Sequence, residues 1–466
     1  MQYSKVHKVA VIGLGYVGLP LASICAAAGY IVQGYDTNHK ITESLQSGQC
    51  SLQDYNVEKL FNKGMKSGGL SFSSDLESIK DCSIYLVCVP TPINKNKDPD
   101  LNPLISAIEA ISPFFIKDNL IVIESTVFPG TCNDIVRPVI EKVSGLSCLD
   151  DIFLAHCPER VNPGDKFWTS ANIPRVIGAI TEESVKYGAE FYSSVLGGPV
   201  FDVTEVKSAL SPKFSLDLNG QVNTKHLPLG SVIKMRTIRD AEAVKAMENT
   251  VRDVNIAFVN ELAKISRVLQ LDVVDVIDGM ATKPFGKGPF YPGVGVGGHC
   301  IAVDPEWLRS ASEKAGYVPD MIRLARGING SMPDYVVGLL EDSLQDFGLS
   351  LSQINVAILG VSYKRNVADS RESPFFEVRK ILCDKRATIS VYDPWVTLEN
   401  TELEFTDILT KADALIIVTD HAEIVRGLEE FDWSSSNVKV VIDGRNCLKP
   451  DFLPTTIAYM GVGRFS

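Results

Sequence analysis

The chain has 466 residues, of which 45% are hydrophobic and 22% are charged, and its formal net charge is −12. A chain of this length is too long to fold around a single hydrophobic core, so two or three domains are predicted. The composition excludes a disordered or fibrous protein. The negative charge argues against broad binding to nucleic acid or to an anionic membrane surface.

The ten cysteines indicate a cytoplasmic protein with free thiols. No C-x-x-C pair occurs in the sequence, which disfavours zinc ribbons and thioredoxin-like sites, and we expect no bound metal. A chain of this size also needs no disulfide bonds to hold its fold.

The first predicted elements are a strand at 9–12, a helix from near Gly15 to Ala28 and a strand at 31–35. No charged residue lies between Val9 and Tyr35, so hydropathy alone would also allow a membrane helix or a signal peptide. Five glycines and a proline interrupt this run, and buried parallel strands are apolar on both faces. We therefore interpret the run as a buried βαβ unit and expect no membrane insertion.

The glycine pattern in this unit predicts a dinucleotide site. Gly13, Gly15 and Gly18 form G-x-G-x-x-G between the first strand and the helix, and Asp36 ends the second strand. The three glycines would allow a tight turn, close approach to a pyrophosphate and close helix packing, and the helix N-terminus would attract the phosphates. Asp36 would bind the ribose hydroxyls and repel a 2′-phosphate, which favours NAD over NADP.

Further strands are expected at 83–91, 120–126 and 151–160, with helical patterns between them, and this alternation predicts a parallel, doubly wound sheet. The stretch 207–239 carries six Lys or Arg and one acid, Asp217. We interpret it as an inserted surface loop, and contact with an anionic partner or the cofactor is the alternative.

A long helix is expected from Asp240 to Leu271, because this stretch contains no Gly or Pro and its apolar residues recur at helical spacing. It would span about 45 Å and connect two domains. On its face, Lys245 and Asn249 lie four residues apart, so they could together stabilise an oxyanion. A solvated helix face is the alternative reading of this pair.

The last part of the chain repeats the first. "VAVIGLGY" returns as "VAILGVSY" from Val356, "VQGYDTN" returns as "ISVYDPW" from Ile389, and two further strand segments follow in the same order. This predicts a second, related α/β domain. The copy lacks the glycine triplet and has Lys364 in the turn, so we expect its sheet to bind a ligand other than a dinucleotide.

Cys300 follows a run with four glycines, at Gly293, Gly295, Gly297 and Gly298. Glycines allow backbone amides to approach a ligand closely. A thiolate beside a nicotinamide could capture an aldehyde as a thiohemiacetal, and loss of a second hydride would give a thioester that water hydrolyses. This predicts oxidation of an alcohol to an acid with two NAD, whereas the alternative is a buried structural cysteine. Asp304 and Pro305 predict a helix start, as N-cap and first helical residue.

These motifs together resemble the UDP-glucose/GDP-mannose dehydrogenase family, over nearly the whole chain. The matching segments are "VIGLGYVGLPLA", "VPTPIN", "ESTVFPGT", "PERVNPGD", "VKAMENT", "GVGVGGHCIAVD", "GVSYKRNVADSRESP" and "DGRN". The resemblance implies an NAD-dependent enzyme that oxidises the C6 alcohol of a nucleotide sugar to a carboxylate. It also implies an α/β fold with two doubly wound Rossmann-like domains joined by a long central helix.

The resemblance implies three domains, and the basic insertion after the first is longer than the family's usual connection and has no assigned role. An NAD-binding Rossmann domain would occupy 1–206, the basic insertion 207–239, a central helical domain for catalysis and dimerisation 240–335, and a UDP-sugar-binding Rossmann-like domain 336–466. Cys300 would be the nucleophile, Lys245 and Asn249 would stabilise the oxyanion, and three residues would act in proton transfer and hydrolysis: Asp304, Thr126 and Glu159.

The ligand contacts follow by the same resemblance. The residues expected to bind NAD are Gly13, Leu14, Gly15, Tyr16, Val17, Gly18, Asp36, Pro90, Thr91, Ser125, Thr126 and Arg371. Those expected to bind the UDP-sugar are Glu159, Arg160, Lys245, Asn249, Tyr291, Gly293, Gly295, Gly297, Tyr363, Lys364 and Arg445, with 291–297 over the pyrophosphate.

His299 in "GGHCI" resembles the branch that oxidises UDP-N-acetylglucosamine or UDP-N-acetylmannosamine. The resemblance therefore implies a UDP-N-acetylhexosamine 6-dehydrogenase that forms a homodimer or a higher homo-oligomer through the central helix and supplies uronic acids for surface polysaccharide. A UDP-glucose 6-dehydrogenase is the nearest alternative. A non-catalytic NAD-binding regulator would not need Cys300, Lys245 or Asn249, and a single-step alcohol dehydrogenase would not need the thiol.

Overall fold

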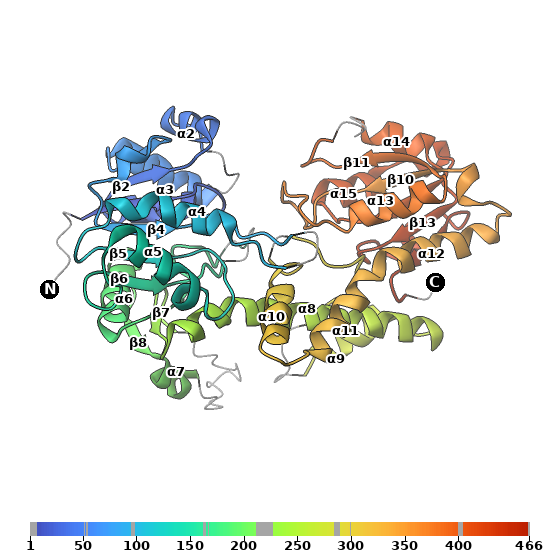
Figure 1. Cartoon of the computed structure of the whole chain (residues 1–466). Coiled ribbons are helices and arrows are strands. Elements are labelled where there is room, and N and C mark those ends of the chain that lie inside the picture. Colours follow the sequence, from blue (N-terminus) through green and yellow to red (C-terminus); the bar gives the residue numbers. More distant parts are fainter. Residues whose placement is uncertain are drawn as a thin grey trace, which may run out of the picture. The chain divides into compact units, whose positions relative to one another are not determined.

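The computed structural model describes residues 7–50, 52, 55–94, 98–161, 165, 167–210, 227–283, 289–298, 300–398 and 404–464 (Figure 1). The chain divides into two compact units, residues 1–247 and 248–466. The boundary between them falls inside the longest helix, α8 (Ile238–Val268). The four segments predicted from the sequence, with bounds at 206, 239 and 335, remain predictions.

Unit 1 contains a nine-stranded sheet in the order β3-β2-β1-β4-β5-β6-β7-β9-β8. Its strands are parallel from β3 to β6, and β7 runs antiparallel to β6. The strands are β1 (Lys8–Ile12), β2 (Ile31–Tyr35), β3 (Leu70–Ser73), β4 (Ile84–Val87), β5 (Leu120–Ile123), β6 (Phe153–His156), β7 (Arg175–Ala179), β8 (Val200–Asp202) and β9 (Val232–Lys234). The helices are α1 (Gly18–Ala27), α2 (His39–Gln46), α3 (Tyr55–Lys66), α4 (Asn102–Ile111), α5 (Arg137–Ser144), α6 (Glu182–Leu196) and α7 (Val203–Leu210).

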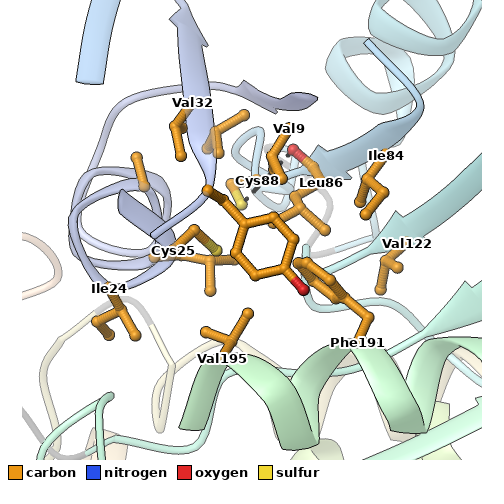
Figure 2. Close-up of a cluster of buried hydrophobic side chains, with 14 of the residues drawn as sticks. Val9, Ile24, Cys25, Val32, Ile84, Leu86, Cys88, Val122, Phe191 and Val195 are labelled. Atoms are coloured by element: carbon orange, nitrogen blue, oxygen red, sulfur yellow. Dashed lines mark hydrogen bonds between the residues drawn. The ribbon is translucent and has the colours of Figure 1, made fainter. Parts of the chain in front are cut away.

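The core of unit 1 explains the uncharged N-terminal run. Figure 2 shows Val9, Val32 and Leu86 from the sheet packed with Cys25 of α1 and Phe191 of α6. Helix α1 has nine of its ten residues buried, so a charge at almost any position would be desolvated. The βαβ interpretation is therefore confirmed.

The turn after β1 is longer than the sequence suggests. Residues 15–17 form a turn, and regular helix begins at Gly18, although the Leu19 N–H already donates to the Gly15 carbonyl at 3.1 Å. A Cβ on Gly18 would lie only 1.8 Å from the Gly13 carbonyl oxygen. The third glycine therefore allows the helix to pack directly against the end of the strand, as expected.

The basic stretch 207–239 is not one continuous loop. Helix α7 extends to Leu210, β9 covers Val232–Lys234, and α8 begins at Ile238. Strand β9 is ordered because it pairs with both β7 and β8. Residues 211–226, including Asp217, lie outside the described residues.

Unit 2 contains a five-stranded parallel sheet in the order β11-β10-β12-β13-β14. The strands are β10 (Asn355–Leu359), β11 (Thr388–Tyr392), β12 (Ala414–Ile417), β13 (Val440–Asp443) and β14 (Ala458–Gly461). Strand β10 pairs with β11 and β12 in parallel, as β1 pairs with β2 and β4. The repeat seen in the sequence is therefore a repeat of strand order, and the prediction of two related α/β sheets is confirmed.

The other helices of unit 2 are α9 (Val273–Ala281), α10 (Asp304–Lys314), α11 (Asp320–Gly330), α12 (Met332–Gln345), α13 (Phe375–Asp384), α14 (Phe405–Lys411) and α15 (Ala422–Glu430). Helix α8 ends three residues before the predicted end. Gln270 adopts a φ of 58°, and Leu271 N–H donates to the Ser266 carbonyl at 2.8 Å. This is the hydrogen-bond pattern of a Schellman motif, which ends a helix.

Among the described residues, no helix combines the length and the apolar character that crossing a membrane would require.

Candidate active site

The glycine turn of unit 1 has the shape of a dinucleotide site. Gly13 adopts a φ of 90° and donates its N–H to the Tyr35 carbonyl at 2.8 Å. A Cβ on Gly15 would have no atom within 4 Å, so the backbone there faces open space. The turn therefore leaves room for a pyrophosphate at Gly15, beside the partial positive charge at the N-terminus of α1. Val17 and the half-exposed Tyr16 complete the turn.

Asp36 is fixed by the same turn. Its Oδ2 accepts the Leu14 N–H at 2.8 Å, and its Oδ1 accepts the Asn38 N–H at 2.9 Å. The side chain is only partly buried. Each carboxylate oxygen retains lone-pair capacity, so the residues present fit the adenosine ribose of NAD.

Two loops that follow β4 and β5 are joined by side-chain hydrogen bonds. Thr91 Oγ1 donates to the Thr126 carbonyl at 2.8 Å, and Ser125 Oγ donates to the Val89 carbonyl at 2.7 Å. Pro90 lies in the first loop and is exposed. The carboxyl ends of parallel strands are where ligands bind in such sheets, and the predicted residues of both loops lie there together.

A buried ionic network lies behind these loops. Arg175 of β7 is 1% exposed and contacts Glu124 at 2.9 Å and Glu159 at 2.6 Å. Tyr192 donates to Glu124 from α6. Burial raises the pKa of Glu124; burial also acts to raise that of Glu159, but Arg175 and two backbone amides lower the pKa of Glu159 below its usual range. Glu159 is therefore held as a carboxylate.

Both oxygens of Glu159 are already engaged. Oε2 faces Arg175, and Oε1 accepts the N–H groups of Arg160 and Val161 at 2.8 and 2.9 Å. The Arg160 guanidinium also donates to the Pro174 carbonyl at 3.0 Å. Sequence reasoning found Glu159 but missed Arg175, although an arginine at the start of the apolar segment "RVIGA" was an available signal.

Lys245 lies on α8 near two buried titratable residues of unit 1. Glu242, three residues earlier, accepts the N–H groups of Gly130 and Cys132 at 2.5 and 2.7 Å. His156 is fully buried, and burial, with the Lys245 charge as a second cause, lowers the pKa of His156 to about 3. Neither Glu242 nor His156 was predicted, because neither belongs to a motif that the sequence pattern singles out.

Asn249, one helical turn after Lys245, contacts a candidate residue of unit 2. Its Nδ2 donates to Asp304 Oδ2 at 2.6 Å, and Asp304 is 2% exposed. The prediction of Asp304 as an N-cap is wrong. Val303 occupies the N-cap, Asp304 is the first helical residue, and no side chain caps the helix. The Asp304 carboxylate accepts a hydrogen bond from Asn249 of α8.

Cys300 is partly exposed, which argues against the purely structural alternative. Its carbonyl accepts the N–H groups of Val303 and Asp304 at 3.1 and 2.8 Å, so the start of α10 fixes its backbone. Burial raises the thiol pKa at Cys25, Cys82, Cys88, Cys132, Cys148, Cys157 and Cys447, where a thiolate is disfavoured. His299 lies outside the described residues.

The glycines before Cys300 have a packing reason that the sequence did not reveal. We call residues 291–298 the glycine loop. A Cβ on Gly293 would lie 2.7 Å from Arg445 Nη1, and a Cβ on Gly297 would lie 2.7 Å from the Glu372 carbonyl oxygen. Gly298 has a φ of 85° and faces the Tyr363 ring. Close approach to other chain segments, and not only to a ligand, therefore requires glycine here.

The glycine loop lies against Tyr363 and Arg445, which were predicted to bind the UDP-sugar, and against Arg371, which was predicted to bind NAD. Gly298 N–H donates to the Arg371 carbonyl at 3.0 Å, and the Arg371 side chain pairs with Asp369 at 2.7 Å. Lys364 follows Tyr363 and is partly buried. At the loop's other end, the Tyr291 hydroxyl donates to Asp278 at 2.5 Å.

Comparison with known proteins gives a consistent result along the chain. The UDP-glucose/GDP-mannose dehydrogenase family matches with its NAD binding domain at residues 7–196, its central domain at 239–331 and its UDP binding domain at 357–450. The UDP-N-acetyl-D-mannosamine dehydrogenase of Pyrococcus horikoshii is 33% identical over 458 residues, which cover 98% of this chain and 99% of that protein.

Two further comparisons agree with this. The UDP-N-acetyl-D-glucosamine 6-dehydrogenase of Salmonella typhi is 34% identical over 443 residues, covering 94% of this chain and 95% of that protein. A solved structure of the Pyrococcus horikoshii UDP-D-ManNAc dehydrogenase, 31% identical, superposes with a TM-score of 0.85 and covers 98% of this chain and 99% of that one. The chain therefore belongs to the UDP-glucose/GDP-mannose dehydrogenase family and is an NAD-dependent nucleotide-sugar dehydrogenase.

Proposed function

We propose that the protein oxidises the C6 alcohol of a UDP-N-acetylhexosamine to the uronic acid in two successive oxidations. The observation that carries the proposal is the group formed by Cys300, Asp304 and Asn249. The Cys300 carbonyl accepts the Asp304 N–H, and the Asp304 carboxylate accepts the Asn249 amide. The backbone of Cys300, whose side chain is partly exposed, is thus fixed to that of Asp304, whose buried carboxylate binds an amide donor.

The glycine turn and Asp36 would hold NAD, which when bound would supply the hydride acceptor for C6 in each of the two oxidations. The first oxidation gives an aldehyde, and the Cys300 thiol adds to its carbonyl carbon to form a thiohemiacetal. The second oxidation gives a thioester. Water then hydrolyses the thioester, which releases the carboxylate and regenerates the thiol.

The surrounding residues would stabilise charge and move protons. We assign Lys245 to the developing oxyanion, with Asn249 as a second donor held in place by Asp304. Asp304 and Thr126 would take part in proton transfer and in the hydrolysis of the thioester by water. Because both oxygens of Glu159 are engaged by Arg175 and backbone amides, we propose that Glu159 holds its loop in place and leaves proton transfer to the other two.

The N-acetylated substrate is supported by the names of the relatives and by His299 in the sequence. A substrate panel tests this choice: UDP-N-acetylglucosamine, UDP-N-acetylmannosamine, UDP-N-acetylgalactosamine and UDP-glucose are each incubated with NAD. We expect kcat/KM to be highest for an N-acetylated sugar. A preference for UDP-glucose would instead support the UDP-glucose 6-dehydrogenase alternative.

The two-step chemistry is tested by stoichiometry. We expect two NADH per sugar nucleotide, and Cys300→Ser should lower the rate of acid formation by about 10³-fold or more, because the aldehyde can no longer be captured. Cys383→Ser, which changes an exposed thiol elsewhere in unit 2, is the matched control and should leave the rate unchanged. One NADH with free aldehyde, or acid formation at the normal rate by the Cys300 variant, would rule out the thioester route.

We further propose that the chain forms a homodimer and acts in the cytoplasm, where its product would supply uronic acids for surface polysaccharide. The dimer is supported by an apolar stripe on α8, in which Met247, Val251, Phe258 and Ile265 are each about half exposed. These residues recur at helical spacing, so one face of the helix presents them together. A second copy of the same stripe is its natural partner, because two-fold contacts pair identical surfaces.

A further inference from the structure

A chain of buried side-chain amides connects α8 and α11 to the glycine loop. Asn260 Oδ1 accepts the Gly293 N–H at 2.9 Å, and Asn260 Nδ2 donates to Asn329 Oδ1 at 2.9 Å. Asn329 Nδ2 donates in turn to Asp253 Oδ1 at 2.8 Å and to the Asp253 carbonyl at 3.1 Å. The last contact of the series is an ion pair, in which Arg326 Nη1 lies 3.0 Å from Asp253 Oδ1.

The direction of these hydrogen bonds is determined by charge. Asp253 is ion-paired with Arg326 and offers only acceptors, so Asn329 must present its NH₂ group to Asp253 and its oxygen to Asn260. Asn260 must then present its NH₂ group to Asn329 and its oxygen to Gly293. A reversed amide at either position would place two donors or two acceptors face to face, away from bulk solvent, since Asn260, Asn329 and Asp253 are 0%, 2% and 0% exposed.

At its other end, this series of side-chain amides binds the backbone of the glycine loop. Gly293 N–H is held by Asn260 and Gly298 N–H by the Arg371 carbonyl, so both ends of the loop are fixed. Between them, Val294 is 1% exposed, and a Cβ on Gly295 would lie 3.1 Å from the Asn329 carbonyl oxygen. The Asn329 side chain therefore supports the loop through Asn260. Its backbone carbonyl leaves little room for a side chain at position 295 of the loop.

We infer that Asn260, oriented by Asn329 and Asp253, is a positioning residue that holds the glycine loop in the conformation that binds the diphosphate of the UDP-sugar. This rests on the proposed function, in which the loop lies over the substrate pyrophosphate. Asn260 acts through the loop backbone and makes no contact with the reacting atoms. Its loss should thus weaken nucleotide binding and raise KM more than it lowers kcat.

The experiment measures the affinity for UDP alone and for NAD alone by calorimetry. Asn260→Ala should weaken UDP binding about tenfold, because a buried N–H loses its acceptor, and should leave NAD binding within about twofold. Asn255→Ala, on the same helix and outside the network, is the matched control and should change neither. Asn260→Ala with UDP affinity within about twofold of the wild type would overturn the inference.

The orienting role of Asn329 has its own test. Asn329→Ala should weaken UDP binding in the wild-type background. Asn260→Asp still presents an acceptor to Gly293, but it sets its second oxygen against Asn329 Oδ1, so adding Asn329→Ala should relieve that contact and should not weaken UDP binding further. An equal loss from Asn329→Ala in both backgrounds would mean that Asn329 acts by packing alone, and would overturn this step.

Hydrogen exchange keeps the inference testable if a variant fails to fold. In the unliganded wild type, the Gly293 amide should exchange slowly, and Asn260→Asp should preserve that protection. Fast exchange at Gly293 in the wild type would overturn the inference without any variant. The proposed function and this inference can fail separately. A wild type that binds no UDP, or that forms one NADH per substrate, would contradict the proposed function. The exchange rate at Gly293 would still decide whether Asn260 holds the loop.

Discussion

Two aspartates in equivalent positions show how one residue type serves the two sheets differently. Asp36 ends β2 and binds the Leu14 N–H of the glycine turn, and Asp393 ends β11 and binds the N–H groups of Val361 and Ser362 in the corresponding turn. Asp393, however, is 6% exposed and also contacts His421 at 3.2 Å. Burial acts to raise its pKa, but the hydrogen bonds from His421 and the turn amides lower the pKa of Asp393 to about 2. The carboxylate oxygens of Asp393 accept hydrogen bonds from groups within unit 2, whereas those of Asp36 keep lone pairs for a ribose.

His156 gives a prediction for pH dependence. Its pKa is lowered from 6.5 to about 3, so the folded protein keeps it neutral while the unfolded chain takes up a proton below pH 6.5. Stability is therefore fully present above pH 6.5 and falls as the pH drops towards 3. Between pH 6.5 and 5 this loss amounts to about 2 kcal/mol. Replacing His156 with Leu should remove this loss, because a leucine side chain takes up no proton in either the folded or the unfolded chain.

The measurement is the urea midpoint of unit 1 at pH 6.5 and at pH 5, for the wild type and His156→Leu. His39→Gln, at an exposed position, is the matched control and should keep the wild-type difference between the two pH values. The same difference in His156→Leu as in the wild type would show that the acid sensitivity arises elsewhere.

At the scale of elements, α8 presents two faces with different tasks. One face carries the apolar stripe, and the other carries Glu242, Lys245, Asn249, Asp253 and Asn260 at helical spacing. On this polar face, Glu242, Asn249, Asp253 and Asn260 each form a hydrogen bond with a loop or a neighbouring helix. Within each unit, the helix therefore fixes the loops that its polar side chains contact.

Glu242 tests this view of α8. Glu242→Gln would turn an NH₂ group towards one of the two backbone N–H groups, at Gly130 or Cys132, that the carboxylate now accepts. We expect a loss of about 2 kcal/mol in the stability of unit 1, and a fall of about tenfold in kcat with little change in the KM of the UDP-sugar. Thermal melts and steady-state kinetics give both quantities. Glu261→Gln, at an exposed position of α8, should behave as the wild type; a Glu242 variant that does so as well would contradict the anchoring role.

At the scale of the whole molecule, the apolar stripe of α8 predicts assembly. Light scattering should give a mass of about twice the 50.9 kDa of one chain. Phe258→Glu should lower it to that of a single chain, because a charge would be buried at the centre of the contact. Arg252→Gln, on the exposed surface of the same helix, should leave the mass unchanged. A Phe258 variant that keeps the larger mass would show that the stripe is not the interface.

Much of this architecture could be predicted from local pattern. The βαβ unit, the second sheet and the long helix each follow from periodicity or from repeated strands, which report on the few residues nearest in sequence. The helix ends were less accurate, as with Gln270, because a left-handed residue other than glycine leaves no clear mark in the sequence.

The sequence by itself determined the fold class, the glycine turn with Asp36, and Cys300 as the candidate nucleophile, since each depends on residue types at short, fixed spacing. Only the tertiary structure decided the partners: Asp304 binds Asn249, Arg175 joins Glu124 to Glu159, and Asn260 reaches Asn329 and Gly293. Asn249 and Asp304 are 55 residues apart in the sequence, and Asn260 and Asn329 are 69 apart. Buried polar groups must find partners wherever the fold brings them, and no local pattern encodes that choice.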